Sequence, residues 1–280
     1  MTTQFARADA FRALHHRPGA FVIPNPWDEA SARLLAALGF EALATTSAGY
    51  ANALGRRDGE VTLAEKIAHC SALCSATDLP VSADFENGFA DDPAQVAVNL
   101  LAAAQSGIVG ASIEDYSVNS AAPIYDFTHA VERVAAAAEA VHALPYPFTL
   151  TARAENHLRG RHDLDDTLRR LQAFAAAGAD VLYAPGLTTL EQIRLVTAAV
   201  SRPVNVLAPM VKGVSVAELA AVGVKRISVG GTLARAATGA LLRAGREMLE
   251  DGRFEWTSEI ASTSEVERLL ALGASSRSPS

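Results

Sequence analysis

The sequence predicts a single (β/α)8 barrel of the triosephosphate isomerase type, followed by an extra helical segment. Eight short runs of apolar and β-branched residues alternate with longer Ala- and Leu-rich stretches of helical period. Each crossover helix returns the chain to the same edge of the sheet, so the strands are parallel, and eight of them close a barrel. The 280 residues suit one barrel of about 250 residues with short extensions. An open doubly wound sheet is the alternative, but no Gly-x-Gly-x-x-Gly follows the first strand.

The expected strands and helices follow one another without a linker. The strands are Phe21–Asn25, Ala42–Ser47, Val81–Glu86, Val109–Asp115, Thr149–Glu155, Val181–Gly186, Pro203–Ala208 and Arg226–Gly231. The clearest helices are Asp28–Leu38, Thr62–Ala76, Pro93–Ser106 and Asp163–Ala177, and the N-terminal stretch MTTQFARADAFRALHH also has an amphipathic helical pattern. Four glycines end helices just before strands, where a C-cap can require positive φ: Gly39, Gly107, Gly178 and Gly223.

The C-terminal residues extend beyond the eight strand–helix units of the expected barrel. We expect residues 1–250 to form the barrel with its N-terminal helix, residues 251–272 to form a helical extension, and residues 273–280 to be a frayed tail. Phe254, Trp256 and the helix Ser264–Leu272 have no obvious place on a core already covered by eight helices. A homo-oligomer, either a dimer or a tetramer, would cover them. The alternative is that the segment folds back over the N-terminal face of its own barrel.

Composition excludes several classes of protein. The net charge of −7 and the absence of a basic run argue against nucleic acid or an anionic membrane as a partner. No secretory signal and no apolar run of about 20 residues are present, which excludes a transmembrane helix. Cys70 and Cys74 stand four apart in a helical stretch, so we expect two buried thiols and a cytoplasmic protein.

Polar residues gather where the strands end, at the predicted catalytic mouth of the barrel. They are Thr45, Thr46 and Ser47; Asp84, Glu86 and Asn87; Glu114 and Asp115; Arg153, Glu155, Asn156 and His157; Asn205; and Ser228. Asp84 and Glu86 are two apart and point to one face of their strand. Several carboxylates at one mouth repel one another unless a cation binds, and oxygen ligands favour Mg²⁺ or Mn²⁺. Arg153 would hold a substrate carboxylate bidentately.

Several of these residues have a plain structural explanation as well. Asp58, in the loop before Thr62, could be a surface charge or a helix cap. Glu155 could form a salt bridge with Arg153. His157 is expected on a loop surface, and Ser228 is either an anion-binding or a packing hydroxyl.

Five segments together resemble the isocitrate lyase / phosphoenolpyruvate mutase superfamily over about residues 20–245. They are PNPWDEASARLLAALGF, TTSAGYANALGRRDGE, SADFENGFADD, GIVGASIEDY and TARAENHLRG. The resemblance implies that Asp84 is the direct Mg²⁺ ligand and that Asp58, Glu86 and Glu114 hold metal-bound waters. It implies that Thr46, Ser47 and Ala48 receive the substrate carboxylate and oxo group, with Arg153 as the substrate-binding arginine.

Two departures from the family pattern bear on the reaction. Isocitrate and methylisocitrate lyases carry Lys-[Lys/Arg]-Cys-Gly-His after the fourth strand, but here that loop reads SVNSAAPIYDFTHA, without Cys or Lys. Phosphonomutases have an Asn in this loop, which Asn119 could supply, and a His after the sixth strand. Here the sixth strand ends in Ala184-Pro185-Gly186. Both reactions are therefore disfavoured.

The expected function is that of a Mg²⁺-dependent lyase acting on a small 2-oxo or 2-hydroxy acid, with decarboxylation of an oxaloacetate-like acid fitting best. Enolate charge would be stabilised by the metal. Catalytic candidates are Arg153, Asp58, Glu114 and Tyr50, and substrate-binding candidates are Thr46, Ser47, Ala48, Arg153, Asn205 and Ser228. Tyr50, Tyr116 or a metal-bound water could protonate the product, and the loop Tyr116–Asp126 could close over the site. The alternatives are a C–C or P–C bond hydrolase resembling a phosphonomutase, and a non-catalytic barrel that binds a 2-oxo acid.

Overall fold

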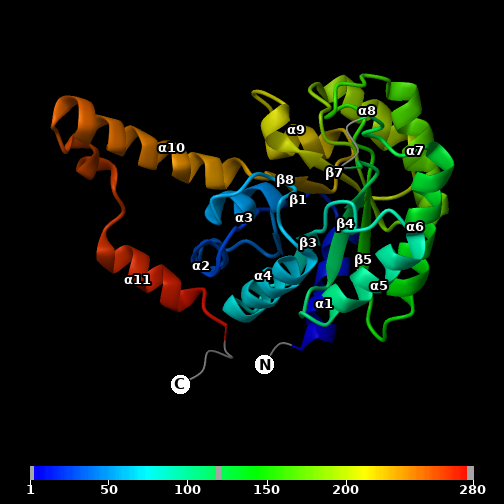
Figure 1. The fold of residues 1–280 in the computed structure, drawn as a ribbon, viewed down its shortest axis with the longest axis horizontal. Helices are drawn as coiled ribbons and strands as arrows, with labels where there is room; N and C mark the ends of the chain where they lie inside the picture. Colours follow the sequence, from blue (N-terminus) through cyan, green and yellow to red (C-terminus); the bar gives the residue numbers. More distant parts are fainter. Residues whose placement is uncertain (1–2, 118–120, 276–280) are drawn as a thin grey trace.

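The computed structural model describes residues 3–117 and 121–275 and shows the predicted barrel (Figure 1). Eight parallel strands run in the order β1-β8-β7-β6-β5-β4-β3-β2. They are β1 (Phe21–Ile23), β2 (Leu43–Ala44), β3 (Val81–Asp84), β4 (Gly110–Glu114), β5 (Thr149–Arg153), β6 (Val181–Tyr183), β7 (Val204–Leu207) and β8 (Arg226–Ser228). Between the two end strands of this order, the Ala44 amide donates to the Pro24 carbonyl at 3.0 Å. The barrel is therefore nearly closed.

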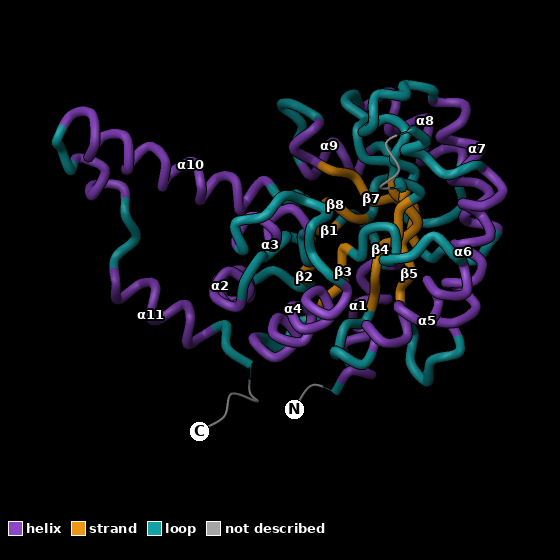
Figure 2. The backbone as a smooth tube through the Cα atoms, in the orientation of Figure 1, coloured by secondary structure: helices purple, strands orange, loops and turns teal. Residues whose placement is uncertain are grey.

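Helices follow the strands, and most of them cover the outside of the barrel (Figure 2). They are α1 (Gln4–His16), α2 (Glu29–Ala37), α3 (Ser47–Ala53), α4 (Leu63–Ala76), α5 (Pro93–Ala104), α6 (Phe127–His142), α7 (Leu164–Ala176), α8 (Leu190–Ala199), α9 (Val216–Ala221), α10 (Thr232–Arg246) and α11 (Thr263–Leu272). The four glycines expected at helix ends all have positive φ, between 90° and 108°. The expected strands extend beyond the observed ones mainly at their carboxyl ends, because the polar residues there leave the sheet and enter the site.

The N-terminal helix α1 closes the end of the barrel opposite the predicted mouth. Phe11 of α1 is fully buried and meets Phe21 of β1 edge to face, with 6.5 Å between ring centroids. Gly110 of β4 makes room for it, since a Cβ there would lie 3.0 Å from the Phe11 ring and 2.8 Å from the Thr149 carbonyl oxygen. Truncating a buried phenylalanine to alanine costs about 3–5 kcal/mol, so this plug contributes substantially to stability.

The cysteines are buried free thiols on α4, as expected. Burial raises the pKa of Cys70 to about 11, which keeps this thiol protonated at neutral pH. Within the described residues, no helix has the length and apolar character needed to cross a membrane.

The C-terminal part forms an arm that leaves the barrel (Figure 1). α10 projects outward, continues through a π-helical turn (Glu247–Asp251), and is followed by a short 3-10 helix (Glu255–Glu259). α11 then returns to α2 of the same chain, where Gly273 lies directly against Arg33. α10 thus lies N-terminal to residue 251, where the sequence predicts the start of the extension, and that boundary stays a prediction.

The arm exposes large apolar side chains. Leu241, Leu249, Phe254 and Ile260 are 60% or more exposed. Soluble monomers rarely leave such a surface uncovered. Burial against a second copy of the chain remains a proposal.

Candidate active site

Two adjoining cavities open at the carboxyl ends of the strands. The first, here the barrel cavity, has a volume of about 170 Å³ and reaches down between the strands to Ser82 and Arg226. The second, here the loop cavity, has a volume of about 220 Å³ and is bordered by Gly59 and Tyr116. Both are lined by Ser47, Asp58, Arg153 and Leu158. They form one polar site at the predicted mouth.

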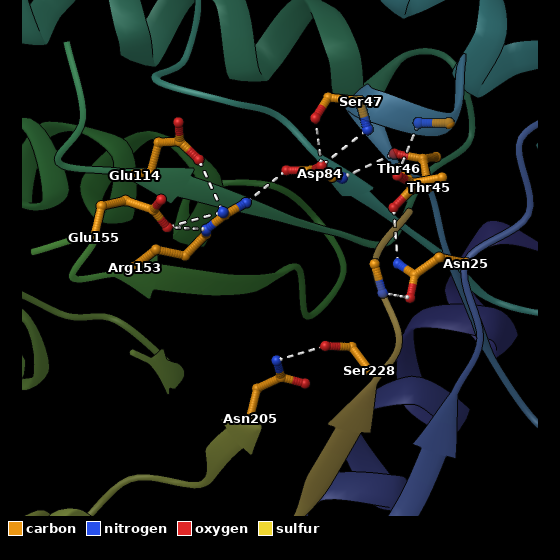
Figure 3. A network of polar contacts seen from close by, with 12 residues as sticks. Asn25, Thr45, Thr46, Ser47, Asp84, Glu114, Arg153, Glu155, Asn205 and Ser228 are labelled. Carbon is orange, nitrogen blue, oxygen red and sulfur yellow. Dashed lines mark hydrogen bonds and ion pairs between the residues drawn. The ribbon is translucent and has the colours of Figure 1, made fainter. Parts of the chain in front are cut away.

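Arg153, at the end of β5, is held by three carboxylates (Figure 3). Its Nη1 donates to Asp84 Oδ1 at 2.7 Å, and its Nη2 lies 3.1 Å from Glu114 Oε2. Its Nε donates to Glu155 Oε1 at 2.9 Å. Burial alone would lower the pKa of Arg153, but the carboxylates raise it well above its usual value. Glu155 is fully buried, and the salt bridge considered for it is present, with 2.8 Å between Arg153 Nη2 and Glu155 Oε1.

Asp84, at the end of β3, is the best-connected carboxylate of the site. Its Oδ2 accepts hydrogen bonds from the Ser47 amide and hydroxyl, each at 2.9 Å. Below it, the buried Lys66 ammonium donates to Thr45 Oγ1 at 3.1 Å. Burial opposes ionisation of Asp84, but the charges of Arg153 and Lys66 and the Ser47 hydrogen bonds outweigh it and lower its pKa.

The other carboxylates of the site are less well compensated. Burial and the charge of Asp84 raise the pKa of Glu86 to about 7 and also raise that of Asp58. Burial raises the pKa of Glu114 well above its usual value. Glu86 Oε1 is buried without a hydrogen-bond partner, and the Glu86 backbone has φ 48°, a conformation that non-glycine residues rarely adopt.

These carboxylates fit a hard divalent cation. The buried Glu86 oxygen without a hydrogen-bond partner and the carboxylates beside it form the kind of oxygen donor set that Mg²⁺ takes. Of the described residues, no three His, Cys, Asp or Glu side chains gather closely enough to ligate an ion directly. Mg²⁺ commonly takes one or two protein carboxylates and keeps several waters, so the two observations are compatible.

The structure brings most of the predicted site residues together. Thr46, Ser47, Ala48, Asp58, Asp84, Arg153, Asn205 and Ser228 line the barrel cavity, and Glu86 and Glu114 line the loop cavity. The Thr46 hydroxyl also caps α3 by accepting from the Gly49 amide. Asp58 does not cap a helix, because Thr62 is the N-cap of α4.

Tyr50 lines neither cavity. Its ring stacks on His69, with 3.8 Å between the centroids. Tyr116 does line the loop cavity, where the Arg159 guanidinium lies 3.4 Å from its ring centroid. An antiparallel β-bridge between Tyr116 and Ile124 joins the two sides of the loop that begins at Tyr116. Asn119, the residue considered for this loop, lies outside the described residues.

His157 was expected on a loop surface, and this prediction is wrong because the side chain is buried. It is 4% exposed, and the chain after β6 packs against it. A Cβ at Gly186 would lie 2.8 Å from the His157 carbonyl carbon and 2.5 Å from the Leu158 amide nitrogen. This close approach requires a glycine and excludes a larger side chain there. The approach of this chain segment to the His157–Leu158 backbone thus accounts for the glycine at the end of Ala184-Pro185-Gly186.

Four further residues belong to the site but were not foreseen. Lys66 comes from the first turn of α4, Arg159 from the loop after β5, and Tyr183 and Arg226 from inside the barrel. Lys66 and Arg226 look like ordinary surface charges in the sequence. For Tyr183 and Arg226 the sequence signal was the alternation of side chains between the two faces of a strand, which directs these two side chains into the barrel.

The fold and site define a (β/α)8-barrel enzyme with a buried acidic mouth clamped by an arginine. A family model described as Phosphoenolpyruvate phosphomutase matches residues 11–249. The chain therefore belongs to this family, within the isocitrate lyase / phosphoenolpyruvate mutase superfamily of Mg²⁺-dependent lyases and mutases.

Relatives of this chain include enzymes that act on small carboxylic acids. A solved structure from Burkholderia cenocepacia J2315, provisionally described as a lyase/mutase, is 56% identical with a TM-score of 0.94 and covers 96% of this chain and 97% of its own. Oxaloacetate decarboxylase of Paraburkholderia xenovorans is 29% identical over 72% of this chain and 68% of its own. For 2,3-dimethylmalate lyase of Eubacterium barkeri the values are 28%, 69% and 67%.

Proposed function

We propose that this protein is a Mg²⁺-dependent lyase that breaks a C–C bond of a small 2-oxo or 2-hydroxy carboxylic acid. The observation that carries the proposal is the Arg153 cluster, in which one guanidinium joins Asp84, Glu114 and Glu155 at the mouth of the barrel. Such a cluster combines a site for a divalent cation with a fork that matches a carboxylate.

Asp84 would hold the metal, with Asp58, Glu86 and Glu114 around it. Bound Mg²⁺ supplies Lewis-acid chemistry, stabilising negative charge on the oxygen at C2 of the substrate. Arg153 would exchange the Asp84 carboxylate for that of the substrate, since its Nε, Nη1 and Nη2 all contact acidic side chains.

The remaining contacts position the substrate. The Ser47 amide and hydroxyl point at the Asp84 carboxylate and would face a substrate bound beside it. Tyr116 is the favoured proton donor over Tyr50, because it lines the loop cavity next to Glu114 and Arg159.

Two cleavages fit the proposed site. Decarboxylation of an oxaloacetate-like acid needs no proton donor at the bond that breaks, and a relative 29% identical to the chain is an oxaloacetate decarboxylase. Cleavage between C2 and C3 of a malate-like acid is the second, and 2,3-dimethylmalate lyase is a relative at 28% identity. Both reactions place negative charge on the C2 oxygen, before or after the bond breaks.

The test is turnover with Mg²⁺ on a panel of oxaloacetate, malate, 2,3-dimethylmalate and phosphonopyruvate, with products identified by NMR. Pyruvate and CO₂ from oxaloacetate, or a 2-oxo acid from a 2-hydroxy acid, supports the lyase. Oxalate and acetate from oxaloacetate, or inorganic phosphate from phosphonopyruvate, would instead indicate a hydrolase. Saturable binding without turnover would indicate a non-catalytic barrel.

A further inference from the structure

A second arginine, Arg226, lies inside the barrel below the Arg153 cluster. It is the first residue of β8, is 5% exposed, and lines the floor of the barrel cavity. Its Nε donates to Asn205 Oδ1 at 2.9 Å. Its Nη1 is buried and has no hydrogen-bond partner.

The charge of Arg226 is not neutralised, in contrast to that of Arg153. Within residues 3–117 and 121–275, no carboxylate forms an ion pair with Arg226, and the nearest influences on its charge are Tyr183 and the like charge of Arg153. Burial lowers the pKa of Arg226 to about 10, so the group is still cationic at neutral pH. A buried cation without a partner is unfavourable, and proteins usually pair such a group or bind an anion beside it.

The surroundings of Arg226 continue from the proposed substrate site. Asn205 Nδ2 donates to Ser228 Oγ at 2.9 Å, and both side chains line the same cavity as Asp84 and Ser47. Figure 3 shows the Asn205–Ser228 pair set apart from the Arg153–Asp84 network. A small ligand held at Asp84 could therefore extend its other end toward Asn205, Ser228 and Arg226.

We propose that Arg226 binds the second carboxylate of a dicarboxylic substrate, the one that does not approach the metal, and so determines specificity. The inference rests on the proposed function and names its substrate class. One guanidinium with one free Nη1 matches the single charge of a carboxylate. A phosphonate dianion carries more charge than this end of the cavity balances, by analogy with phosphate near neutral pH.

The contact also bears on the bond that breaks. A carboxylate paired with Arg226 is stabilised in its charged form, whereas decarboxylation would require that group to leave as neutral CO₂. Arg226 thus favours cleavage between C2 and C3, in which both carboxylates are retained.

Calorimetric titrations of two ligands in the presence of Mg²⁺ distinguish binding at the metal end of the site from binding at the Arg226 end. Oxalate reaches only the metal end, whereas 3,3-difluorooxaloacetate also carries a distal carboxylate. They are titrated into the wild type, Arg226→Met, Arg226→Lys and the surface control Arg202→Met, each checked for fold by circular dichroism. Arg226→Met should lose tenfold or more in affinity for difluorooxaloacetate while binding oxalate within twofold of wild type. Arg226→Lys, which keeps the charge, should recover part of the loss, and Arg202→Met should match the wild type.

Other results would overturn the assignment. Unchanged difluorooxaloacetate affinity in folded Arg226→Met would mean that an internal water satisfies Nη1. Equal losses for both ligands would mean that Arg226 only shapes the metal end. If Arg226→Met does not fold, Arg226→Lys serves in its place. An affinity loss of Arg226→Lys for difluorooxaloacetate that is no greater than its loss for oxalate would also overturn the assignment. Failure of the wild type to bind oxalate with Mg²⁺ would contradict the proposed function, whereas normal oxalate binding without the predicted difference contradicts only the role of Arg226.

Discussion

Arg153 on β5 reaches across β4 to Asp84 on β3, with 2.7 Å between Nη1 and Oδ1. The pair is largely shielded from water, with side-chain exposures of 12% and 19%. It joins the predicted substrate clamp directly to the predicted metal ligand. A cation bound at Asp84 would compete with Arg153 Nη1 for this carboxylate, and Nη1 could then hold an anion while Nη2 and Nε keep Glu114 and Glu155. Metal and substrate binding should therefore be coupled through this pair.

The first prediction concerns the metal ligand. Asp84→Ala should abolish detectable Mg²⁺ binding and activity while the barrel stays folded, because Arg153 keeps its pairs with Glu114 and Glu155. Calorimetric titration with Mg²⁺ and thermal unfolding by circular dichroism measure the two effects. Asp9→Ala on the exposed face of α1 is the matched control. Wild-type Mg²⁺ affinity in Asp84→Ala would exclude the residue as the ligand.

The second prediction concerns the clamp. Arg153→Lys should weaken substrate binding tenfold or more, because an ammonium cannot reproduce the planar fork, and about 1.4 kcal/mol corresponds to tenfold. The dissociation constant of oxalate with Mg²⁺ is the quantity to measure. Arg194→Lys, at an exposed pair on α8, provides the control. Oxalate affinity equal to wild type would rule out a bidentate contact.

The third prediction concerns pH. Burial lowers the pKa of His15 to about 3, from 6.5 in the unfolded chain. Between these values the unfolded chain binds the extra proton, so His15 costs stability as the pH falls below 6.5. His15→Phe should keep the aromatic contacts with Phe11 and Phe21 and remove this penalty.

Urea unfolding of the wild type and of His15→Phe at pH 7.5 and 5.5 measures the effect. The difference in unfolding free energy should shift by about 1 kcal/mol in favour of the variant at the lower pH. His16→Phe, at the exposed neighbour, is the control for adding an aromatic ring to α1. The buried carboxylates affect the unfolding free energy in the direction opposite to His15. They contribute alike to both proteins at each pH, so the comparison removes their effect.

The fourth prediction concerns assembly. The arm exposes Leu241, Leu249, Phe254 and Ile260, and only α11 returns to the barrel. The full chain should therefore form a dimer or tetramer at micromolar concentration, and a chain ending at Glu250 should be smaller in subunit number. Light scattering on both proteins decides. A monomeric full chain would show that the arm does not mediate assembly.

The sequence predicted the barrel because strand period and helix signals act locally. Capping residues such as Asp28 and Thr62 and the predicted helix-end glycines each behave as short-range patterns require. It predicted the carboxylates and Arg153 because strand ends of a parallel barrel must meet at one mouth.

Residues that reach the site from elsewhere could not be predicted in this way. Lys66 stands in the first turn of α4, and its burial against Thr45 depends on how this helix packs against the barrel. Arg226 lies at the start of a strand, far from the mouth in sequence terms, and only its long side chain reaches the cavity. The outward course of α10 likewise depends on packing that no local pattern specifies.

The central claim is Mg²⁺-dependent C–C cleavage at the Arg153–Asp84 pair. The most direct test follows products by NMR for wild type and Asp84→Ala, with oxaloacetate or 2,3-dimethylmalate and with Mg²⁺ or excess EDTA. The wild type with Mg²⁺ should form cleavage products faster than the reaction without enzyme, and neither EDTA-treated wild type nor Asp84→Ala should exceed that uncatalysed rate. Enzyme-catalysed cleavage that persists at the wild-type rate in EDTA or in Asp84→Ala would contradict the central claim.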